Sequence, residues 1–406
     1  MSLNGQSRTL SATELAREVN AGRLKARDVI LDHLEAIDAA SELNAFITIC
    51  GDRALDRASN LPAGPLAGVP VAVKDMLEVQ GVRTTRGSAP SLSHVARRTA
   101  RAIRRLEEAG AIVIGKANQH EIAWGVTSQN SHWGDVRNPL DHRLSPGGSS
   151  GGNGVALAAR LSVIGIGTDS GGSVRIPSAC CATVGFKPRQ ASVGLDGCFP
   201  LAPTFDTIAP MARSVSDCAL AFSVLSGRRV VPVDVRGIRI ASLVPMPELD
   251  RFAELGAQVL GQRDLPEPRA DFSRIYEVEA ALAHQRWFPS QQEGYGPEAR
   301  TKLSGAHAIS AVEYVHARQE LGRWRREVSE TLALDALITP TLGMHAPAAD
   351  VHEPDIRDRV GAFTRPFSYL DWAAVAIGLL QIASPREDVA FSLALEWEKK
   401  FTMTDD

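Results

Sequence analysis

Two glycine-rich loops each present a serine that could act as a nucleophile. Residues 147–152 read GGSSGG and residues 167–173 read GTDSGGS, so that Ser149 and Ser173 lie 24 residues apart. Glycine neighbours let the backbone approach a substrate closely and adopt conformations that other residues resist. A serine presented in this way is a candidate nucleophile, and the backbone N–H groups beside it are candidate donors to an oxyanion.

Other functions of glycine-rich loops are excluded by the spacing. Residues 165–170 (GIGTDS) nearly match the dinucleotide-binding fingerprint, but a serine replaces the third glycine, and two glycines follow where a helix should begin. The phosphate-binding P-loop, the zinc-protease motif and the nucleophile elbow of the α/β-hydrolases are all absent. A serine nucleophile in this chain therefore needs a base outside these motifs.

Lysine is the residue type that could supply this base. Lysine and arginine together number 44, but only seven are lysines. Arginine keeps its proton in proteins, whereas a buried lysine can be neutral near pH 7. Lys74 ends the apolar run GVPVAV and precedes Asp75, and Lys116 follows a similar run. Composition alone leaves two interpretations open for each lysine, a base or a strand-end lysine whose ammonium group reaches solvent.

Several motifs occur in an order that resembles the amidase signature hydrolases. They are GVPVAVKD at 68–75, GKAN at 115–118, the loop at 147–152, residues 167–177 and VGFKP at 184–188. The similarity extends through residues 195–220, weakens in the middle of the chain, and returns at LITPT (337–341) and TRPF (364–367). The resemblance implies an amidase that hydrolyses linear amide C–N bonds (EC 3.5.1.-) through a serine acyl-enzyme.

The resemblance assigns a role to each candidate catalytic residue. Ser173 is expected to attack the amide carbonyl, Ser149 to relay the proton, and Lys74 to act as the general base. A neutral Lys74 requires that burial and hydrogen bonds lower its pKa from roughly 10.4 towards ~7–8. The resemblance also implies a cis peptide bond between Gly148 and Ser149.

Further residues of the two loops are expected to support this chemistry. The predicted oxyanion hole consists of the backbone N–H groups of Ser170, Gly171, Gly172 and Ser173. The predicted supporting residues, which order the loops by hydrogen bonds, are Ser150, Thr168 and Asp169. Arg175 either binds a substrate carboxylate or pairs with an internal carboxylate. Lys116 is expected to be structural, and Cys180 and Cys181 are expected to pack in the core.

The segment from residue 119 to 132 is expected to line the acyl pocket. Its candidate substrate-binding residues are Gln119, His120, Trp124, Thr127 and Gln129, and they predict a partly polar pocket. The C-terminal part is contracted relative to the family pattern, which favours a small amide substrate. Three alternatives stay open: a glutaminase-type subunit of a tRNA-dependent amidotransferase, a hydrolase of ureido or carboxybiuret-type substrates, and a non-catalytic scaffold.

Alternating helices and strands must position these loops. A capping box at 11–14 predicts a first helix, and residues 28–40 predict a second. Strands are predicted at 68–73, 111–115 and 161–166, with helices at 99–109 and 152–160 between them. Later strands are expected at 238–241, 336–338 and 379–382, and helices at 276–288 and 311–332. This alternation predicts an α/β fold with a mixed, largely parallel central sheet covered by helices on both faces.

Composition narrows the other possibilities. Hydrophobic residues make up 44% and charged residues 22% of the 406 residues, and the net charge is −3. No basic patch suggests nucleic-acid binding, and the longest apolar run is too short to span a membrane. Five cysteines without a disulfide or zinc pattern and an N-terminus without a signal sequence indicate a cytoplasmic enzyme. No metal or organic cofactor is implied, and a homodimer stays open.

One large domain is expected over residues 1–406. We predict an N-terminal helical segment at about 9–62, a core carrying the triad at about 63–230, and a variable C-terminal part at about 231–406 that completes the sheet.

Overall fold

The computed structural model describes residues 5–401, so the outermost residues of the predicted domain, 1–4 and 402–406, lie outside it. An eleven-stranded sheet runs through the molecule in the order β1-β5-β2-β6-β8-β7-β12-β13-β11-β9-β10, and β3 and β4 form a separate pair. The strands are β1 (Phe46–Ile49), β2 (Pro70–Lys74), β3 (Arg83–Thr84), β4 (His94–Val95), β5 (Ile112–Ala117), β6 (Ile164–Thr168), β7 (Val184–Lys187), β8 (Ile208–Ala212), β9 (Arg239–Ser242), β10 (Gln258–Gln262), β11 (Ala336–Pro340), β12 (Ala373–Ile377) and β13 (Leu380–Ser384).

Helices cover both faces of this sheet. They are α1 (Ala12–Asn20), α2 (Ala26–Ala39), α3 (Gly51–Ser59), α4 (Arg101–Glu108), α5 (Gly151–Ala158), α6 (Arg175–Cys180), α7 (Val215–Ser226), α8 (Glu248–Glu254), α9 (Ser273–His284), α10 (Pro297–Ala306), α11 (Ala311–Leu332), α12 (Glu353–Val360), α13 (Arg365–Tyr369) and α14 (Glu387–Phe401). The short 3₁₀ turns are Gln6–Thr9, Ser41–Leu43, Pro90–Leu92, Glu121–Ala123 and Gln292–Gly294.

Alternate residues of the central strands pack into different cores. Val71 and Val73 of β2 join the core that contains side chains of α1, α4, α7 and α14. Ala72, between them, joins the core formed with α2, α3 and α5. Because successive side chains of a strand point to opposite faces, both faces of β2 are buried, which explains its continuous apolar run.

The α/β class and the mixed sheet are confirmed, but the sheet is less parallel than the sequence predicts. Within the described residues, β2 pairs in parallel with β5 and β6, and β9 with β10 and β11. The other six pairings of the large sheet are antiparallel. Strands β7, β8 and β12, which the sequence analysis does not predict, contribute four of these six.

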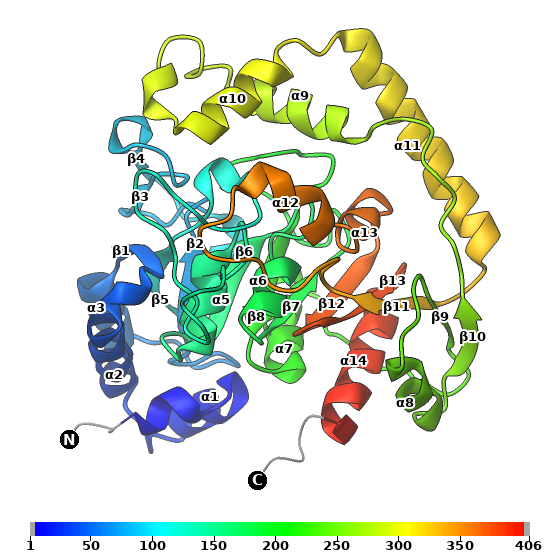
Figure 1. Cartoon of the computed structure of the whole chain (residues 1–406). Coiled ribbons are helices and arrows are strands. Elements are labelled where there is room, and N and C mark those ends of the chain that lie inside the picture. The colour runs from blue at the N-terminus through cyan, green and yellow to red at the C-terminus, as the bar shows by residue number, and fades with distance from the viewer. Residues whose placement is uncertain (1–4, 402–406) are drawn as a thin grey trace.

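Most predicted elements occur where the sequence places them. The capping box between Ser11 and Glu14 begins α1, and the helix predicted at 311–332 is α11. Helices α9, α10 and α11 form an arc along the top of the view in Figure 1, with α12 and α13 between this arc and the sheet. No helix within residues 5–401 is both long and apolar enough to cross a membrane.

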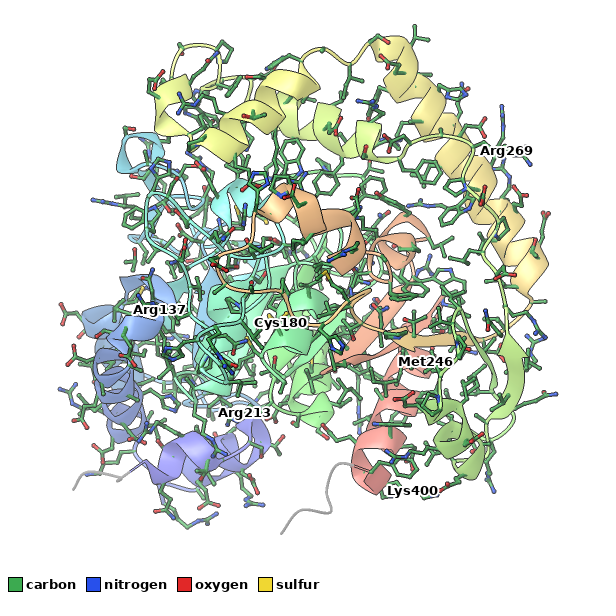
Figure 2. All side chains as sticks on the ribbon, viewed as in Figure 1. Arg137, Cys180, Arg213, Met246, Arg269 and Lys400 are labelled. Atoms are coloured by element: carbon green, nitrogen blue, oxygen red, sulfur yellow. The ribbon has the colours of Figure 1, made fainter. Side chains whose placement is uncertain are left out.

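The five cysteines form no disulfide bonds among the described residues. All five are unpaired, and Cys180 and Cys181 are buried. Figure 2 labels Cys180 near the centre of the molecule, where burial raises the pKa of its thiol to about 12. A thiol held in its neutral form is a poor nucleophile, so the prediction that these two residues serve packing agrees with their surroundings.

Candidate active site

The site is built where two neighbouring parallel strands end. Strands β2 and β6 pair with Val73 opposite Ile166. Lys74 is the last residue of β2, and Thr168 is the last residue of β6. The carboxyl ends of adjacent parallel strands lie at the same edge of a sheet, which is where α/β proteins form their binding sites.

Lys74 lies at this edge, and no carboxylate among residues 5–401 forms an ion pair with its amine. Its side chain is completely buried, and its Nζ donates to Ser149 Oγ at 2.7 Å and to Thr168 Oγ1 at 2.9 Å. Burial lowers the pKa of Lys74 to about 7. A lysine amine surrounded by hydroxyl groups in a water-poor site can therefore be neutral near physiological pH and accept a proton.

The first glycine loop passes between Lys74 and the segment around residue 127. The Gly148–Ser149 peptide bond is cis, as the resemblance predicts. A Cβ on Gly148 would lie 2.8 Å from the backbone nitrogen of Thr127, so a side chain at this position has no room. The N–H of Ser150 donates to the carbonyl of Ser173 at 3.0 Å, which holds the two loops together. The Ser150 hydroxyl donates to the Thr168 carbonyl at 3.4 Å.

The second loop is ordered by Asp169, which is completely buried. Its carboxylate accepts the N–H of Gly172 at 2.8 Å and of Val174 at 3.2 Å, as well as two bonds from the Arg175 guanidinium, both at 2.9 Å. Burial opposes the charge of this carboxylate, but the adjacent Arg175 holds the pKa of Asp169 below its usual value. The loop that carries Ser173 is thus wrapped around a fixed negative charge.

The structure places Arg175 inside the protein rather than in a substrate cavity. Besides Asp169, its guanidinium donates to the Thr364 carbonyl, to Gln381 Oε1 and to Ser368 Oγ at 2.8–2.9 Å. All five of its N–H donors have internal acceptors, and the side chain is completely buried. Of the two alternatives for Arg175, the internal pairing is the one the structure contains.

The backbone donors of the predicted oxyanion hole are not equivalent. Gly172 uses its N–H to bind Asp169, so this group is not free for an oxyanion. Within residues 5–401, no hydrogen bond occupies the N–H groups of Ser170, Gly171 or Ser173. Gly172 has a φ of +130°, and a Cβ there would lie 2.3 Å from Thr364 Oγ1, so the loop requires glycine at this position.

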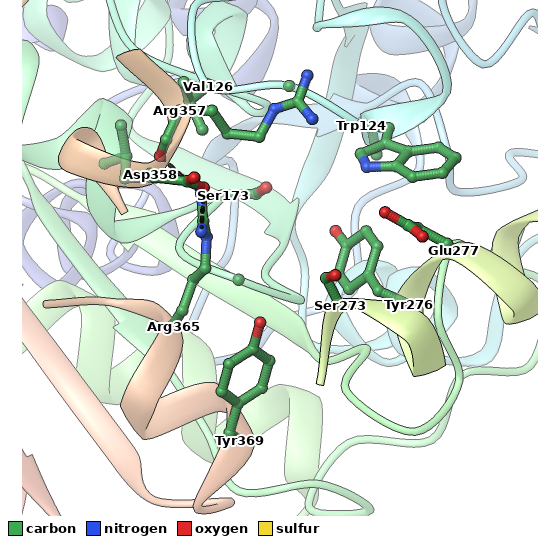
Figure 3. A pocket seen from close by; sticks show the side chains of 14 residues that line it. Trp124, Val126, Ser173, Ser273, Tyr276, Glu277, Arg357, Asp358, Arg365 and Tyr369 are labelled. Carbon is green, nitrogen blue, oxygen red and sulfur yellow. Dashed lines mark hydrogen bonds and ion pairs between the residues drawn. The ribbon is translucent and has the colours of Figure 1, made fainter. Parts of the chain in front are cut away.

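Ser173 borders a cavity of about 280 Å³. The other lining residues come from three parts of the chain. They are Ala123, Trp124, Gly125 and Val126 before the first loop, Gly171 of the second loop with Ile176 of the following α6, and Ser273, Tyr276, Glu277, Arg357, Asp358, Arg365 and Tyr369 of the helices α9, α12 and α13. Figure 3 shows the hydroxyl groups of Tyr276 and Tyr369 directed into this cavity. Ser173 is 8% exposed, whereas Lys74 and Ser149 are inaccessible, so the cavity meets the site at Ser173.

The five candidate substrate-binding residues of the segment 119–132 lie in different parts of the structure. Trp124 lines the cavity beside Ser173 and, with His120 and Gln129, a second cavity under α10. Thr127 is buried and donates to Gln129 Oε1 at 3.1 Å. Gln119 is also buried, and neither atom of its amide has a partner within the described residues. Of this set, only Trp124 borders the cavity at Ser173.

The sequence analysis did not predict the wall formed by α9, α12 and α13. Tyr276, Glu277, Arg357 and Tyr369 lie more than 100 residues after Ser173 in the sequence. One signal was available, because tyrosine is even scarcer than lysine, and two of the four tyrosines line this cavity. The same argument from scarcity that drew attention to Lys74 could have drawn attention to Tyr276 and Tyr369.

Lys116 shows what a structural lysine looks like in this fold. It lies on β5, the neighbour of β2, and its Nζ donates to Asp75 Oδ1 at 2.6 Å and to Thr84 Oγ1 at 3.1 Å. Both partners of this ion pair are completely buried. Among residues 5–401, no group of three or more His, Cys, Asp or Glu side chains could hold a metal ion.

Comparisons with known proteins agree with this geometry. Residues 28–236, just over half of the chain, match the family described as Amidase. A glutamyl-tRNA(Gln) amidotransferase subunit of Deinococcus radiodurans is 32% identical over 392 residues, covering 82% of this chain and 81% of that protein. The solved structure described as "Crystal structure of amidase" matches with a TM-score of 0.83 and 30% identity, over 95% of this chain and 98% of that chain.

A second solved structure is described as an unexpected vestigial protein complex that reveals the evolutionary origins of an s-triazine catabolic enzyme. It matches with a TM-score of 0.85 and 27% identity, over 96% of this chain and 98% of that chain. Together, the fold and these matches define a hydrolase that acts on linear amide C–N bonds (EC 3.5.1.-). The chain belongs to the amidase signature family.

Proposed function

We propose that this enzyme cleaves the C–N bond of a small carboxamide through an acyl-enzyme on Ser173. The observation that carries the proposal is the hydrogen bond of 2.7 Å from the completely buried Lys74 Nζ to Ser149 Oγ. This bond joins the proposed base to a serine whose loop is bonded to the Ser173 loop. The cavity of about 280 Å³ at Ser173 lies just below the usual range of small-molecule sites, roughly 300–1,000 Å³, which supports a small substrate.

The reaction begins with neutral Lys74. Lys74 takes the proton of Ser149, Ser149 takes that of Ser173, and Ser173 Oγ bonds to the carbonyl carbon. The carbonyl oxygen becomes an oxyanion and accepts hydrogen bonds from free backbone N–H groups of the 170–173 loop. When the C–N bond breaks, the proton returns through Ser149 to the leaving nitrogen, and ammonia or an amine departs. Water then attacks the acyl-enzyme, releases the carboxylic acid and restores Ser173.

The supporting residues hold this arrangement. Thr168 accepts the second hydrogen bond of Lys74, Ser150 joins the two loops, and Asp169 fixes the loop of Ser173. Since Gly172 is bound to Asp169, we assign the oxyanion to the N–H groups of Ser173, Gly171 and Ser170. No step of this route calls for a metal ion or an organic cofactor.

The test combines labelling with a substrate screen. A fluorophosphonate probe should label the wild type and not Ser173→Ala, and steady-state hydrolysis should be measured with aliphatic, aryl-acetamide, malonamate-like and ureido amides. Turnover of at least one carboxamide, with release of ammonia or amine in step with the acid, supports the proposal. Absence of labelling, or labelling without any amide turnover, would contradict it.

A glutaminase subunit is the second candidate, because the amidotransferase relative from Deinococcus radiodurans is over 30% identical and covers 82% of this chain. The solved structure described as "Crystal structure of amidase", which is covered over 98% of its length, supports the amidase. Glutamine hydrolysis that appears only when a second subunit co-purifies would favour the amidotransferase. Hydrolysis of other amides by the isolated chain would favour the amidase.

A further inference from the structure

The cavity wall formed by Trp124, Tyr276 and Glu277 has a distinct composition. The rings of Trp124 and Tyr276 lie 5.9 Å apart between centroids and are tilted by 51°. Figure 3 shows the Glu277 carboxylate between these two side chains, with an oxygen directed towards the interior of the cavity. Aromatic faces and a carboxylate are the groups that proteins use to hold an organic cation.

The positive groups in and next to this cavity already have anionic partners. Arg357 binds Glu353, which is buried, through its Nε at 3.0 Å and lies 3.4 Å from Glu298. Lys302, whose Nζ lies 5.8 Å from the Trp124 ring centroid, binds the same two carboxylates. These two cations and two carboxylates balance each other.

The second arginine of the cavity is balanced as well. Arg365 donates to Asp358 Oδ1 at 2.7 Å and also to the carbonyl of Arg357. Neither Arg357 nor Arg365 therefore brings an unmatched positive charge that would call for an anionic substrate.

Glu277 is the lining residue whose charge is incompletely matched. Its cationic neighbour is Arg274, with Nη1 at 3.3 Å from Glu277 Oε2. Arg274 is shared, since its Nε lies 3.7 Å from the carboxylate of Asp271. The Arg274 guanidinium thus lies next to two carboxylates, and burial raises the pKa of Glu277 in spite of the positive charges of Arg274 and Arg357. A further positive charge next to Glu277 would therefore stabilise its carboxylate.

We propose that this wall selects amides whose acyl part carries a primary ammonium group, with Glu277 as the specificity-determining residue. This inference rests on the proposed amidase function and names its substrate class. The substrate amide lies at Ser173, its ammonium group donates to the Glu277 carboxylate, and the rings of Tyr276 and Trp124 flank the alkyl chain and the charge.

The test uses two matched series of amides. One series is the ω-amino carboxamides with two to five methylene groups, and the other consists of the neutral amides in which a methyl group replaces the ammonium. We expect the wild type to favour the ammonium compound by about tenfold or more in kcat/KM at the best chain length, the factor that corresponds to about 1.4 kcal/mol. Glu277→Gln, which keeps the size and removes the charge, should bring this ratio to about one by lowering kcat/KM for the ammonium series.

A control variant and a binding measurement complete the design. Glu254→Gln removes an exposed carboxylate on α8, which Figure 1 places away from α9, and should leave the ratio unchanged. Binding of both series to Ser173→Ala, measured by calorimetry, reports the selectivity without turnover. Ammonium selectivity in binding without hydrolysis by the wild type would overturn the amidase proposal alone. Equal binding of both series, or a ratio that survives Glu277→Gln, would overturn the ammonium proposal.

Discussion

Two completely buried lysines lie on neighbouring strands of the sheet, and their surroundings differ in one essential respect. At the end of β2, Lys74 donates to the hydroxyl groups of Ser149 and Thr168. On β5, Lys116 donates to the carboxylate of Asp75 at 2.6 Å. A carboxylate stabilises the ammonium form, whereas hydroxyl groups in a buried site do so only weakly. We therefore expect Lys74 to act as a base, whereas Lys116 forms a buried ion pair.

The strongest test of this contrast is the loss of the Lys74 amine. Lys74→Met should lower kcat/KM for an amide by about 10⁴-fold, because the base and the acid for the leaving group disappear together. Thermal stability should stay the same or rise, since an apolar side chain replaces a buried amine. Kinetics and calorimetric melting of the same preparation measure both effects, with the exposed Lys25→Met as the control. An active Lys74→Met enzyme would remove Lys74 from the mechanism.

Breaking the Lys116 pair should act on stability instead. Asp75→Asn leaves a buried ammonium without its carboxylate, and such changes cost about 3–5 kcal/mol of folding free energy. Urea unfolding measures this loss, and Asp52→Asn, at an exposed position, is the matched control. The double variant Asp75→Leu/Lys116→Met should recover part of the loss, because no isolated charge then remains buried. A variant Asp75→Asn as stable as the wild type would contradict a structural role for the pair.

A comparison of leaving groups should test whether Lys74 also supplies the proton to the leaving group. An amine leaves poorly without a proton, whereas an alkoxide leaves more readily. Lys74→Met should therefore impair hydrolysis of an ester less than that of the amide with the same acyl group, by about 10²-fold. Parallel measurements of kcat/KM on the two substrates decide the point. An equal loss on both would mean that Lys74 does not protonate the leaving group.

The pH profile should follow the pKa of Lys74, which burial lowers to about 7. Below this pH the protonated amine cannot accept the proton of Ser149, so kcat/KM should fall about tenfold per pH unit and level off above it. A profile without a midpoint near 7 would separate Lys74 from the rate. The measurement requires an amide substrate whose own ionisation lies outside the range studied.

The smallest expected effect concerns Thr168, which accepts from Lys74 Nζ at 2.9 Å. Thr168→Val removes an acceptor that favours the ammonium form, so the midpoint of the pH profile should move down by less than about one unit. Thr207→Val, which removes a hydroxyl bound to the Asp169 carbonyl instead of to Lys74, is the comparison variant. An upward shift in Thr168→Val would show that its hydroxyl stabilises the neutral amine.

Much of the segment that carries the two serine loops could be predicted from local sequence features. The helix α5 and the strand β6 between Ser149 and Ser173 follow from hydrophobic periodicity, and the loops follow from their glycines. The scarcity of lysine drew attention to Lys74. The antiparallel strands β7, β8 and β12 were missed, because fully buried strands have no alternation to mark them, and their pairing direction depends on distant chain segments. The domain boundaries and the roles of the site residues stay predictions.

The sequence by itself determined the family, the two serine loops and the lysine that could serve them, because these properties reside in short motifs and in residue types. Only the tertiary structure decided which of Lys74 and Lys116 binds a carboxylate, that Arg175 binds Asp169, and that the N–H of Gly172 is occupied. The wall of α9, α12 and α13 likewise exists only in the folded chain. A pKa, a free donor and a cavity depend on which groups surround an atom in space, and segments more than 100 residues apart supply those groups here.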